Sequence, residues 1–270
     1  MAGNTKRQVR EFYDKVGWSQ ISEGLYQNAR FEDLRPVSRE YIHKCHLRVK
    51  RYIAPSGDFF LDAGSGPVQY PEYLTYSEGY RFRVCADISI TALMEARKVV
   101  ARHGLYVVAD VSNLPFKADT FDGIVSLHTI HHLPVSEQRG AYLELVRVLK
   151  TGKSAVVVNG WHDPALMKFA EPFIQLGRWL TGRKKKKGWE DNPALTFVER
   201  MTPRWLKHEL KDLDYQIHAW RSMSTRVLRW FIRPKLGGRR VLRIVFWLEE
   251  RFPRFFGENG QYPLIMIRKS

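Results

Sequence analysis

The chain has 270 residues, is 44% hydrophobic and 13% aromatic, and carries a formal net charge of +16. This composition is ample for a packed core of one or two domains. Two cysteines form no disulfide framework or metal cluster, and the longest apolar stretch, interrupted by Arg243, is too short to span a membrane. The first ten residues lack the apolar segment of a secretory signal, so we expect a cytoplasmic protein, with peripheral membrane attachment as an open alternative.

Much of the positive charge lies in two segments. Residues 178–187 contain six cations, and residues 226–257 contain nine Lys or Arg against two Glu. Such segments attract anionic partners, namely a phospholipid surface, a nucleic acid or an acidic substrate. A basic face that serves only solubility is the alternative.

Residues 1–57 are predicted to form an N-terminal helical cap. The segment is polar with scattered aromatic residues, and from Ser38 to Ile53 apolar residues recur at helical spacing. We expect this helix to pack on the sheet that follows.

Strands alternate with helices from Asp58 onward. Ser89 is placed to cap a helix at residues 90–103, and a second helix covers residues 136–149. Five apolar runs of strand length lie at residues 59–61, 81–86, 105–109, 123–127 and 154–158. This pattern predicts an α/β fold with a doubly wound, mostly parallel sheet and helices on both faces.

The alternation breaks after the fifth strand. Residues 161–200 are interpreted as an inserted lid or loop, and Thr202 with Pro203 begins another helix. Residues 216–220 and 264–267 are the predicted sixth and seventh strands. Residues 58–270 are therefore one predicted domain of seven strands, with insertions at about 161–200 and 226–257.

The second insertion combines basic and apolar residues. Arg226, Arg229 and Arg233 are predicted on one helical face, and residues 241–248 are apolar almost all round. Such a segment could lie on an anionic bilayer and admit a lipid-like acceptor. Packing as a lid over the pocket is the alternative.

A glycine turn follows the first strand of the sheet. Gly64 and Gly66 come directly after Asp62, and such glycines let a buried strand turn sharply so that backbone approaches a ligand. Ligands of doubly wound sheets lie at the carboxyl ends of the strands, where Asp87 and Asp110 also fall. Asp87 follows Gly64 by 23 residues, near the spacing of an acid that binds a ribose diol.

A nicotinamide cofactor fits this turn poorly. Its fingerprint requires a third glycine where the chain has Gln69, and Pro67 and Pro71 do not suit the helix amides that bind a pyrophosphate. Asp62 would also repel phosphate. A nucleoside with a cationic amino-acid tail fits better.

The turn at Asp62, the acids Asp87 and Asp110, and the string SLHTIHHLP at residues 126–134 resemble the class I S-adenosylmethionine-dependent methyltransferases. The likeness is to the small-molecule branch with a His-His-Leu segment after the fourth strand, and it covers residues 58–160. It implies a Rossmann-like enzyme that uses S-adenosyl-L-methionine and methylates a small-molecule or lipid-like acceptor.

The resemblance implies a role for each matching residue. Asp62, Gly64 and Gly66 would border the methionine part of the cofactor, with Asp62 near its ammonium group. Asp87 would bind both ribose hydroxyls. Pro67-Val68-Gln69 departs from the family pattern, which leaves the path of this loop open.

The adenine and the sulfonium are assigned in the same way. Ile88 would flank the adenine, Asp110 would accept a hydrogen bond from its amino group, and the amide of Val111 would serve the ring. Leu127 and His128 would lie beneath the sulfonium.

Methyl transfer from a sulfonium is an in-line displacement that needs mostly positioning. A general base is required only if the acceptor must lose a proton, and the nearest candidates are His128, His131 and His132. We retain His128 and His132 as candidate catalytic residues, with a purely structural role as the alternative. Three N-terminal residues are candidates to cover the cofactor: Tyr13, Tyr26 and Arg30.

Two other functions stay open. An RNA methyltransferase is motivated by the charge and by the Ile-His-His run that some tRNA wobble-uridine enzymes share. The Asn/Asp-Pro-Pro-aromatic motif of many nucleic-acid amino methyltransferases is absent, however, as is a suitably placed cysteine nucleophile. The third class is a non-catalytic basic adaptor, which the intact acids and glycines disfavour. The sequence indicates no metal and leaves the oligomeric state open.

Overall fold

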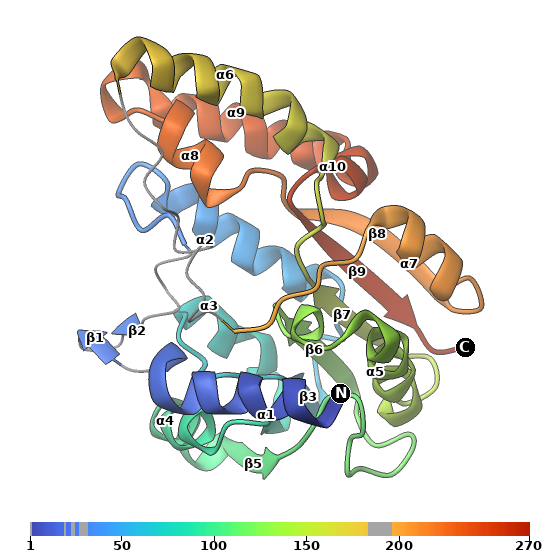
Figure 1. The fold of residues 1–270 in the computed structure, drawn as a ribbon. Helices are drawn as coiled ribbons and strands as arrows, with labels where there is room; N and C mark the ends of the chain where they lie inside the picture. The colour runs from blue at the N-terminus through green and yellow to red at the C-terminus, as the bar shows by residue number, and fades with distance from the viewer. Residues whose placement is uncertain (1, 19, 23–24, 27–31, 183–195) are drawn as a thin grey trace.

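The computed structural model describes the chain except for residues 1, 19, 23–24, 27–31 and 183–195, and gives the backbone alone at residues 2–4, 20–22 and 25–26 (Figure 1). A seven-stranded sheet forms its centre, in the order β5-β4-β3-β6-β7-β9-β8. Neighbouring strands are parallel, except that β9 runs antiparallel to β7 and β8. The strands are β3 (Gly57–Ala63), β4 (Tyr80–Asp87), β5 (Gly104–Val108), β6 (Gly123–Leu127), β7 (Ser154–Val158), β8 (Asp214–Arg221) and β9 (Tyr262–Arg268).

Every predicted strand overlaps an observed one, so the predicted Rossmann-like fold class is confirmed. From β3 the chain proceeds through β4 to the edge strand β5, and then returns to pair β6 with the other side of β3. The strand order therefore reverses between β3 and β6, which is where doubly wound sheets bind ligands.

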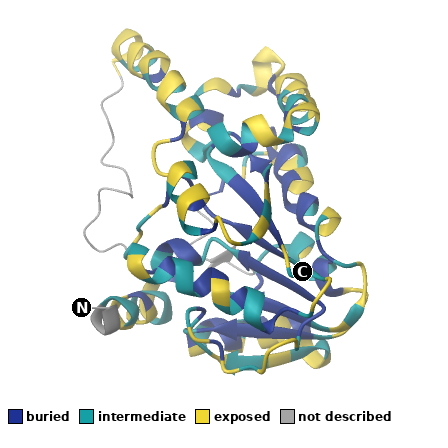
Figure 2. Ribbon diagram, turned by 90° about the vertical axis from the view of Figure 1, so that its right-hand side faces the viewer, coloured by how far each residue is buried: buried dark blue, intermediate teal, exposed yellow. Residues whose placement is uncertain are grey.

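Helices cover both faces of the sheet because successive strand residues point to opposite sides. Leu61 and Ile124 pack in one core with Leu145. Phe60 and Val125 pack in a second core on the other face. Figure 2 shows the central strands mostly in the colour of buried residues, whereas the edge strand β5 has no buried residue.

The longer helices are α1 (Ala2–Phe12), α2 (Arg39–Leu47), α4 (Ile90–Val100), α5 (Val135–Val148), α6 (Ala165–Thr181) and α9 (Gly238–Arg251). The shorter ones are α3 (Pro71–Leu74), α7 (Pro203–Glu209), α8 (Thr225–Phe231) and α10 (Pro253–Asn259). A two-stranded hairpin, β1 (Gln20–Ser22) and β2 (Leu25–Tyr26), was not predicted. Short 3-10 or π turns extend or join these elements, among them Tyr13–Gly17, Arg48–Arg51 and Ile130–His132.

Two predicted helix starts are confirmed by their caps. The hydroxyl of Ser89 accepts a hydrogen bond from the Ala92 amide at 3.1 Å, at the start of α4. The hydroxyl of Thr202 accepts one from the Trp205 amide at 3.1 Å, with Pro203 in the first turn of α7.

Two features of the insertions differ from expectation. Residues expected to belong to a lid or loop form the regular helix α6, which accommodates Pro172 in its interior. The prediction that Arg226, Arg229 and Arg233 share one helical face is wrong for Arg233, because α8 ends at Phe231. Arg233 has extended backbone (φ −116°, ψ 131°), the conformation favoured for a residue that precedes a proline.

The described helices include none with the length and hydrophobicity needed to cross a bilayer. Helices α6, α8, α9 and α10 gather at the opposite end of the molecule from α1 and β5 (Figure 1).

Candidate functional site

The glycine turn after β3 adopts left-handed backbone at alternate residues. Gly64 has φ +76°, Gly66 has φ +54° and Val68 has φ +54°. The Gly64 amide donates to the carbonyl of Ala86 at 2.7 Å, which ties the turn to β4. A Cβ atom on Gly64 would lie 2.2 Å from the side chain of Thr129, so the turn has no room for one there. The loop path that the sequence left open is therefore a tight turn beside β4.

Asp87 lies next to this turn at the end of β4. One carboxylate oxygen accepts a hydrogen bond from the Gly66 amide at 2.8 Å, and the other accepts one from the Ser89 amide at 2.8 Å. Burial raises the pKa of Asp87 to about 6, in spite of these two bonds. The structure thus brings together Gly64, Gly66 and Asp87 as the sequence predicted.

Asp62 has a partner inside the protein that the sequence did not reveal. Its carboxylate forms a buried ion pair with Arg83 of β4. The same guanidinium donates to the carbonyl of Tyr73 at 2.6 Å. The role of Asp62 beside a cofactor ammonium stays a prediction.

Asp110 follows β5 and is fixed from both sides. The amide and hydroxyl of Ser112 donate to one oxygen at 2.9 and 2.8 Å, and Lys6 of α1 lies 2.6 Å from the other. Burial raises the pKa of Asp110, but the bonds from Lys6 and Ser112 outweigh it and hold that pKa below its ordinary value. Val111 is buried beside it. Ile88 and Leu127 lie at the same carboxyl ends of the strands, and both are partly exposed.

The N-terminal segment covers these strand ends. In addition to the Lys6 contact, the Ser89 hydroxyl donates to Asp14 at 2.5 Å, and the ring of Trp18 lies 3.0 Å from where a Cβ of Gly66 would be. Tyr13 stacks on Trp18 with a centroid separation of 5.0 Å. Of the predicted covering residues, Tyr13 is thus in place, whereas Arg30 and the side chain of Tyr26 lie outside the described residues.

Three histidines follow β6, and burial lowers the pKa of each. The pKa is about 3 for His128 and about 4 for His132, and that of His131 lies well below its ordinary value. His128 adopts φ +57°, and its ring meets Trp220 and Tyr262 edge-on at centroid distances of 5.0 and 5.4 Å. All three imidazoles are therefore neutral at neutral pH.

His132 is held between two oxygen atoms. Its Nδ1 lies 2.7 Å from the carbonyl of Phe197, and its Nε2 lies 2.8 Å from the hydroxyl of Tyr13. Because a carbonyl can only accept, Nδ1 is assigned the proton and Nε2 accepts from Tyr13. The arrangement suits a contact that holds the N-terminal segment closed, because both ring nitrogens are occupied and the lowered pKa makes His132 a weak base.

A second group of side chains, missed by the sequence reasoning, lies beside His128. Trp220 and Arg221 end β8, and Tyr262 begins β9. The Arg221 guanidinium pairs with Glu32 and lies 4.7 Å from the centre of the Tyr262 ring. Among the described residues, the buried Trp220 Nε1 and Arg221 Nε atoms have no hydrogen-bond partner. The sequence offered one sign of this group, because Trp220 stands at the carboxyl end of the predicted sixth strand.

This second group extends to α2. His46 stacks on Trp220 with a centroid distance of 5.4 Å and lies 3.5 Å from Glu32. Burial alone would raise the pKa of Glu32, but Arg221 and His46 outweigh it and lower that pKa to about 2. The strand ends thus present an acidic and glycine-lined half next to an aromatic and charged half. No cluster of metal-ligating side chains occurs in the described part of the chain.

Comparison with known proteins relates this chain to methyltransferases. The family model described as "Methyltransferase domain" matches residues 61–157. The tRNA (carboxymethyluridine(34)-5-O)-methyltransferase of Arabidopsis thaliana is 37% identical over 109 residues, which is 40% of this chain and 25% of that protein. The chloroplastic 2-methyl-6-phytyl-1,4-hydroquinone methyltransferase 1 of Oryza sativa subsp. japonica is 30% identical over 130 residues, 45% of this chain and 36% of that protein.

A solved structure resembles nearly the whole chain. Geranyl diphosphate C-methyltransferase from Streptomyces coelicolor A3(2) covers 98% of this chain and 98% of its own, with a TM-score of 0.57 and 13% identity. At that identity the likeness shows a shared fold. The chain spans about a quarter of the length of the tRNA enzymes that it matches, at 25%, 21% and 27%.

Proposed function

The chain carries a class I S-adenosylmethionine-dependent methyltransferase domain, and we propose that it is an enzyme that transfers a methyl group to a small or lipophilic acceptor. One observation carries the proposal. The glycine turn, Asp87 and Asp110 converge at the carboxyl edge of the sheet, where the strand order reverses.

The residues present fit the cofactor. Asp87 is buried, and its oxygens accept two amide bonds, while a carboxylate offers about four acceptor positions. Two positions would thus be open to the ribose hydroxyls. Asp110 would serve the adenine amino group and Val111 the ring, with Ile88 flanking it.

The remaining matched residues would hold the methionine part. Gly64 and Gly66 expose backbone to it, and Asp62 would lie near the ammonium. Leu127 and His128 would lie beneath the sulfonium. The bound cofactor supplies an electrophilic methyl group, so the chain's own residues mainly have to position the acceptor in line with it.

The acceptor side supports a small or lipophilic molecule. The half-buried Tyr262 meets His128 beside the place assigned to the sulfonium, with the buried Trp220 packed behind it, and an aromatic ring of this kind binds apolar molecules. The likeness to the rice hydroquinone enzyme favours the same class. His128 and His132 stay the candidate bases for an acceptor that has a proton to lose, and their lowered pKa values favour an acceptor that loses its proton readily.

The proposal is tested by comparing the affinity for S-adenosylmethionine of the unchanged protein and of the variant Asp87→Asn. Loss of the charged acceptor for the ribose hydroxyls is expected to weaken binding of S-adenosylmethionine by about ten- to a hundredfold in isothermal titration calorimetry. Asp58→Asn is the matched control, because Asp58 is exposed at the other end of β3. Absence of binding by the unchanged protein, or equal affinity of the Asp87 variant, would overturn the proposal.

A tRNA methyltransferase is the second candidate. The net charge of +16 and the 37% identity to the plant tRNA enzyme favour it. Transfer of a labelled methyl group to either lipid extract or total tRNA separates the two. Labelled lipid supports the leading proposal, whereas labelled RNA that ribonuclease removes favours the second. Cofactor binding without transfer to any extract fraction would favour a non-catalytic adaptor.

A further inference from the structure

Helix α6 exposes a row of large apolar side chains in addition to polar ones such as Lys168 and Gln175. The apolar side chains of this row are 53% to 78% exposed, and they recur every three or four residues. They are Phe169, Phe173, Leu176, Trp179 and Leu180. A surface helix of a globular protein ordinarily turns such a stripe toward the core. We call these five residues the α6 stripe.

The opposite side of α6 is held firmly against α8. A Cβ on Gly177 would lie 3.1 Å from the ring of Trp230, so the two helices approach closely there. Glu171 pairs with Arg226 at 2.5 Å, and Ile174 is fully buried. The outward orientation of the stripe is therefore a property of the fold.

Helix α9 presents a second apolar surface next to arginines. Val241, Ile244 and Trp247 are 43% to 60% exposed, at the spacing of one helical face. Arg240 and Arg251 are exposed and fall on the same side of the helix.

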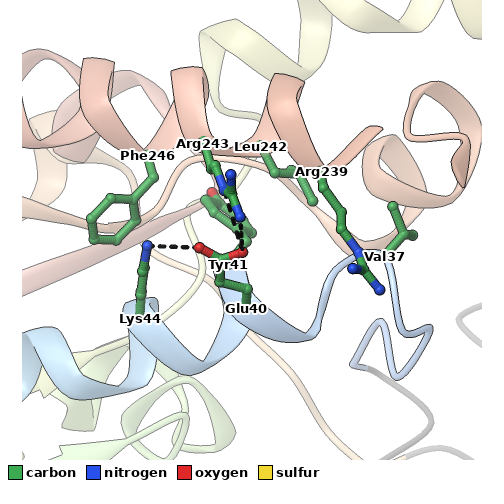
Figure 3. A pocket seen from close by; sticks show the side chains of 8 residues that line it. All are labelled: Val37, Glu40, Tyr41, Lys44, Arg239, Leu242, Arg243 and Phe246. Carbon is green, nitrogen blue, oxygen red and sulfur yellow. Dashed lines mark hydrogen bonds and ion pairs between the residues drawn. The ribbon is translucent and has the colours of Figure 1, made fainter. Parts of the chain in front are cut away.

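The other side of α9 packs on α2. Leu242 and Phe246 line a groove between the two helices, and Glu40 bridges Lys44 and Arg243 across it (Figure 3). Helices α6 and α9 both belong to the end of the molecule opposite α1 and β5 (Figure 1), where Figure 2 shows many exposed residues.

We infer that the α6 stripe and the outward face of α9 dock on the surface of an anionic phospholipid bilayer. Exposed apolar surface of this extent marks an interaction site. Trp and Phe next to arginines match the boundary between acyl chains and anionic headgroups. The sequence also places five consecutive cations, residues 183–187, shortly after α6, although they lie outside the described residues.

Charge and chemistry favour a bilayer over the other occupants. Binding of nucleic acid is driven by cations on phosphates and gives no reason for a five-residue apolar stripe. A second copy of the chain would bring the arginines of α9 close to those of its partner. The inference goes beyond the proposed function, because docking requires no methyl transfer.

Vesicle co-sedimentation tests the inference. The unchanged protein is expected to bind vesicles of phosphatidylcholine mixed with phosphatidylserine more tightly than vesicles of phosphatidylcholine alone. The double variant Phe173→Ser with Trp179→Ser is expected to bind the mixed vesicles about a hundredfold more weakly, since each large apolar side chain contributes about tenfold. Arg240→Glu with Arg251→Glu is expected to remove the preference for anionic vesicles.

The matched control lies on α4, at the other end of the molecule. Ile90 and Met94 are 58% and 63% exposed, so Ile90→Ser with Met94→Ser removes comparable apolar surface. This variant should bind vesicles as the unchanged protein does. Circular dichroism of all variants should match, because every changed residue is exposed.

Three results would overturn the inference. The first is equal vesicle binding by the α6 and α4 variants. The second is a dimer in light scattering that the α6 variant converts to monomer, with no vesicle binding, which would assign the stripe to a second copy. The third is RNA binding that depends on the stripe while vesicles do not bind.

Discussion

The half-buried imidazole of His132 is neutral because its place between Tyr13 and the Phe197 carbonyl disfavours the charged form. An exposed imidazole has a pKa of about 6.5. Burial lowers the pKa of His132 to about 4. Below about pH 6.5 the unfolded chain therefore binds a proton that the folded site excludes. The stabilisation contributed by neutral His132 is complete above about pH 6.5 and is lost as the pH falls toward about 4.

We expect His132→Gln to reduce the acid sensitivity of folding. The free energy of unfolding of the unchanged protein should fall as the pH drops from about 6.5 to about 4, and the variant should show a shallower fall. Urea denaturation at several pH values measures both. His162→Gln is the control, since His162 is exposed. Parallel curves for His132→Gln and the unchanged protein would mean that His132 does not titrate in this way.

The turn between β3 and the next helix requires both left-handed backbone and free space. Gly64 and Gly152 share φ +76°, but a Cβ on Gly64 would meet Thr129 at 2.2 Å, whereas nothing lies within 4 Å of one on Gly152. Alanine substitutions at Gly64 and Gly152 therefore separate two costs in stability, that of left-handed backbone in a non-glycine residue and that of a steric clash with Thr129.

Gly152→Ala is expected to lower the free energy of unfolding by about 1–2 kcal/mol, the cost of a left-handed non-glycine residue. Gly64→Ala should cost more than about 3 kcal/mol and should also weaken cofactor binding, because Thr129 or the turn must move. Chemical denaturation and calorimetry measure these effects. Equal losses from the two variants would contradict a steric role for Thr129.

The elements of the sheet were predictable because each strand is an apolar run bounded by turn residues. The cap of Ser89 was predictable for the same local reason. Helix α6 was not recognised, since Pro172 interrupts the helical pattern and basic residues follow it. The pairing of Asp62 with Arg83 was also out of reach, because it joins residues 21 positions apart through strand register.

At the scale of the whole molecule, the helices at the α6 end are joined to the sheet through Glu249. This buried carboxylate of α9 accepts hydrogen bonds from Tyr41 of α2 at 2.6 Å and from the Ser222 amide, just after β8, at 2.8 Å. It also pairs with the buried Arg48 at 2.8 Å. Three elements thus meet at one side chain.

Glu249→Gln is expected to lower the free energy of unfolding by about 3–5 kcal/mol, because Arg48 loses its buried counter-charge. Glu250→Gln is the control. Glu250 also pairs with Arg48, but its side chain is 30% exposed, so the loss should be about 1 kcal/mol or less. Thermal and urea denaturation of the two variants check the difference. Equal effects would show that burial of Glu249 is not what makes the pair matter.

The acidic half of the site was predictable at this scale and the aromatic half was not. Asp87, Asp110 and the glycines stand at the ends of strands that the sequence shows directly. Trp220 and Tyr262 meet only because β9 inserts antiparallel between β7 and β8, an order that apolar runs do not encode.

The N-terminal segment that covers the strand ends also affects the order in which the chain folds. The N-terminal segment touches Ser89, Ser112 and His132 across sequence separations of 75, 106 and 119 residues. Its binding surface does not exist until β3, β4, β5 and β6 have assembled. Residues 6–18 are therefore expected to dock late, after the strands that follow them in the sequence have assembled.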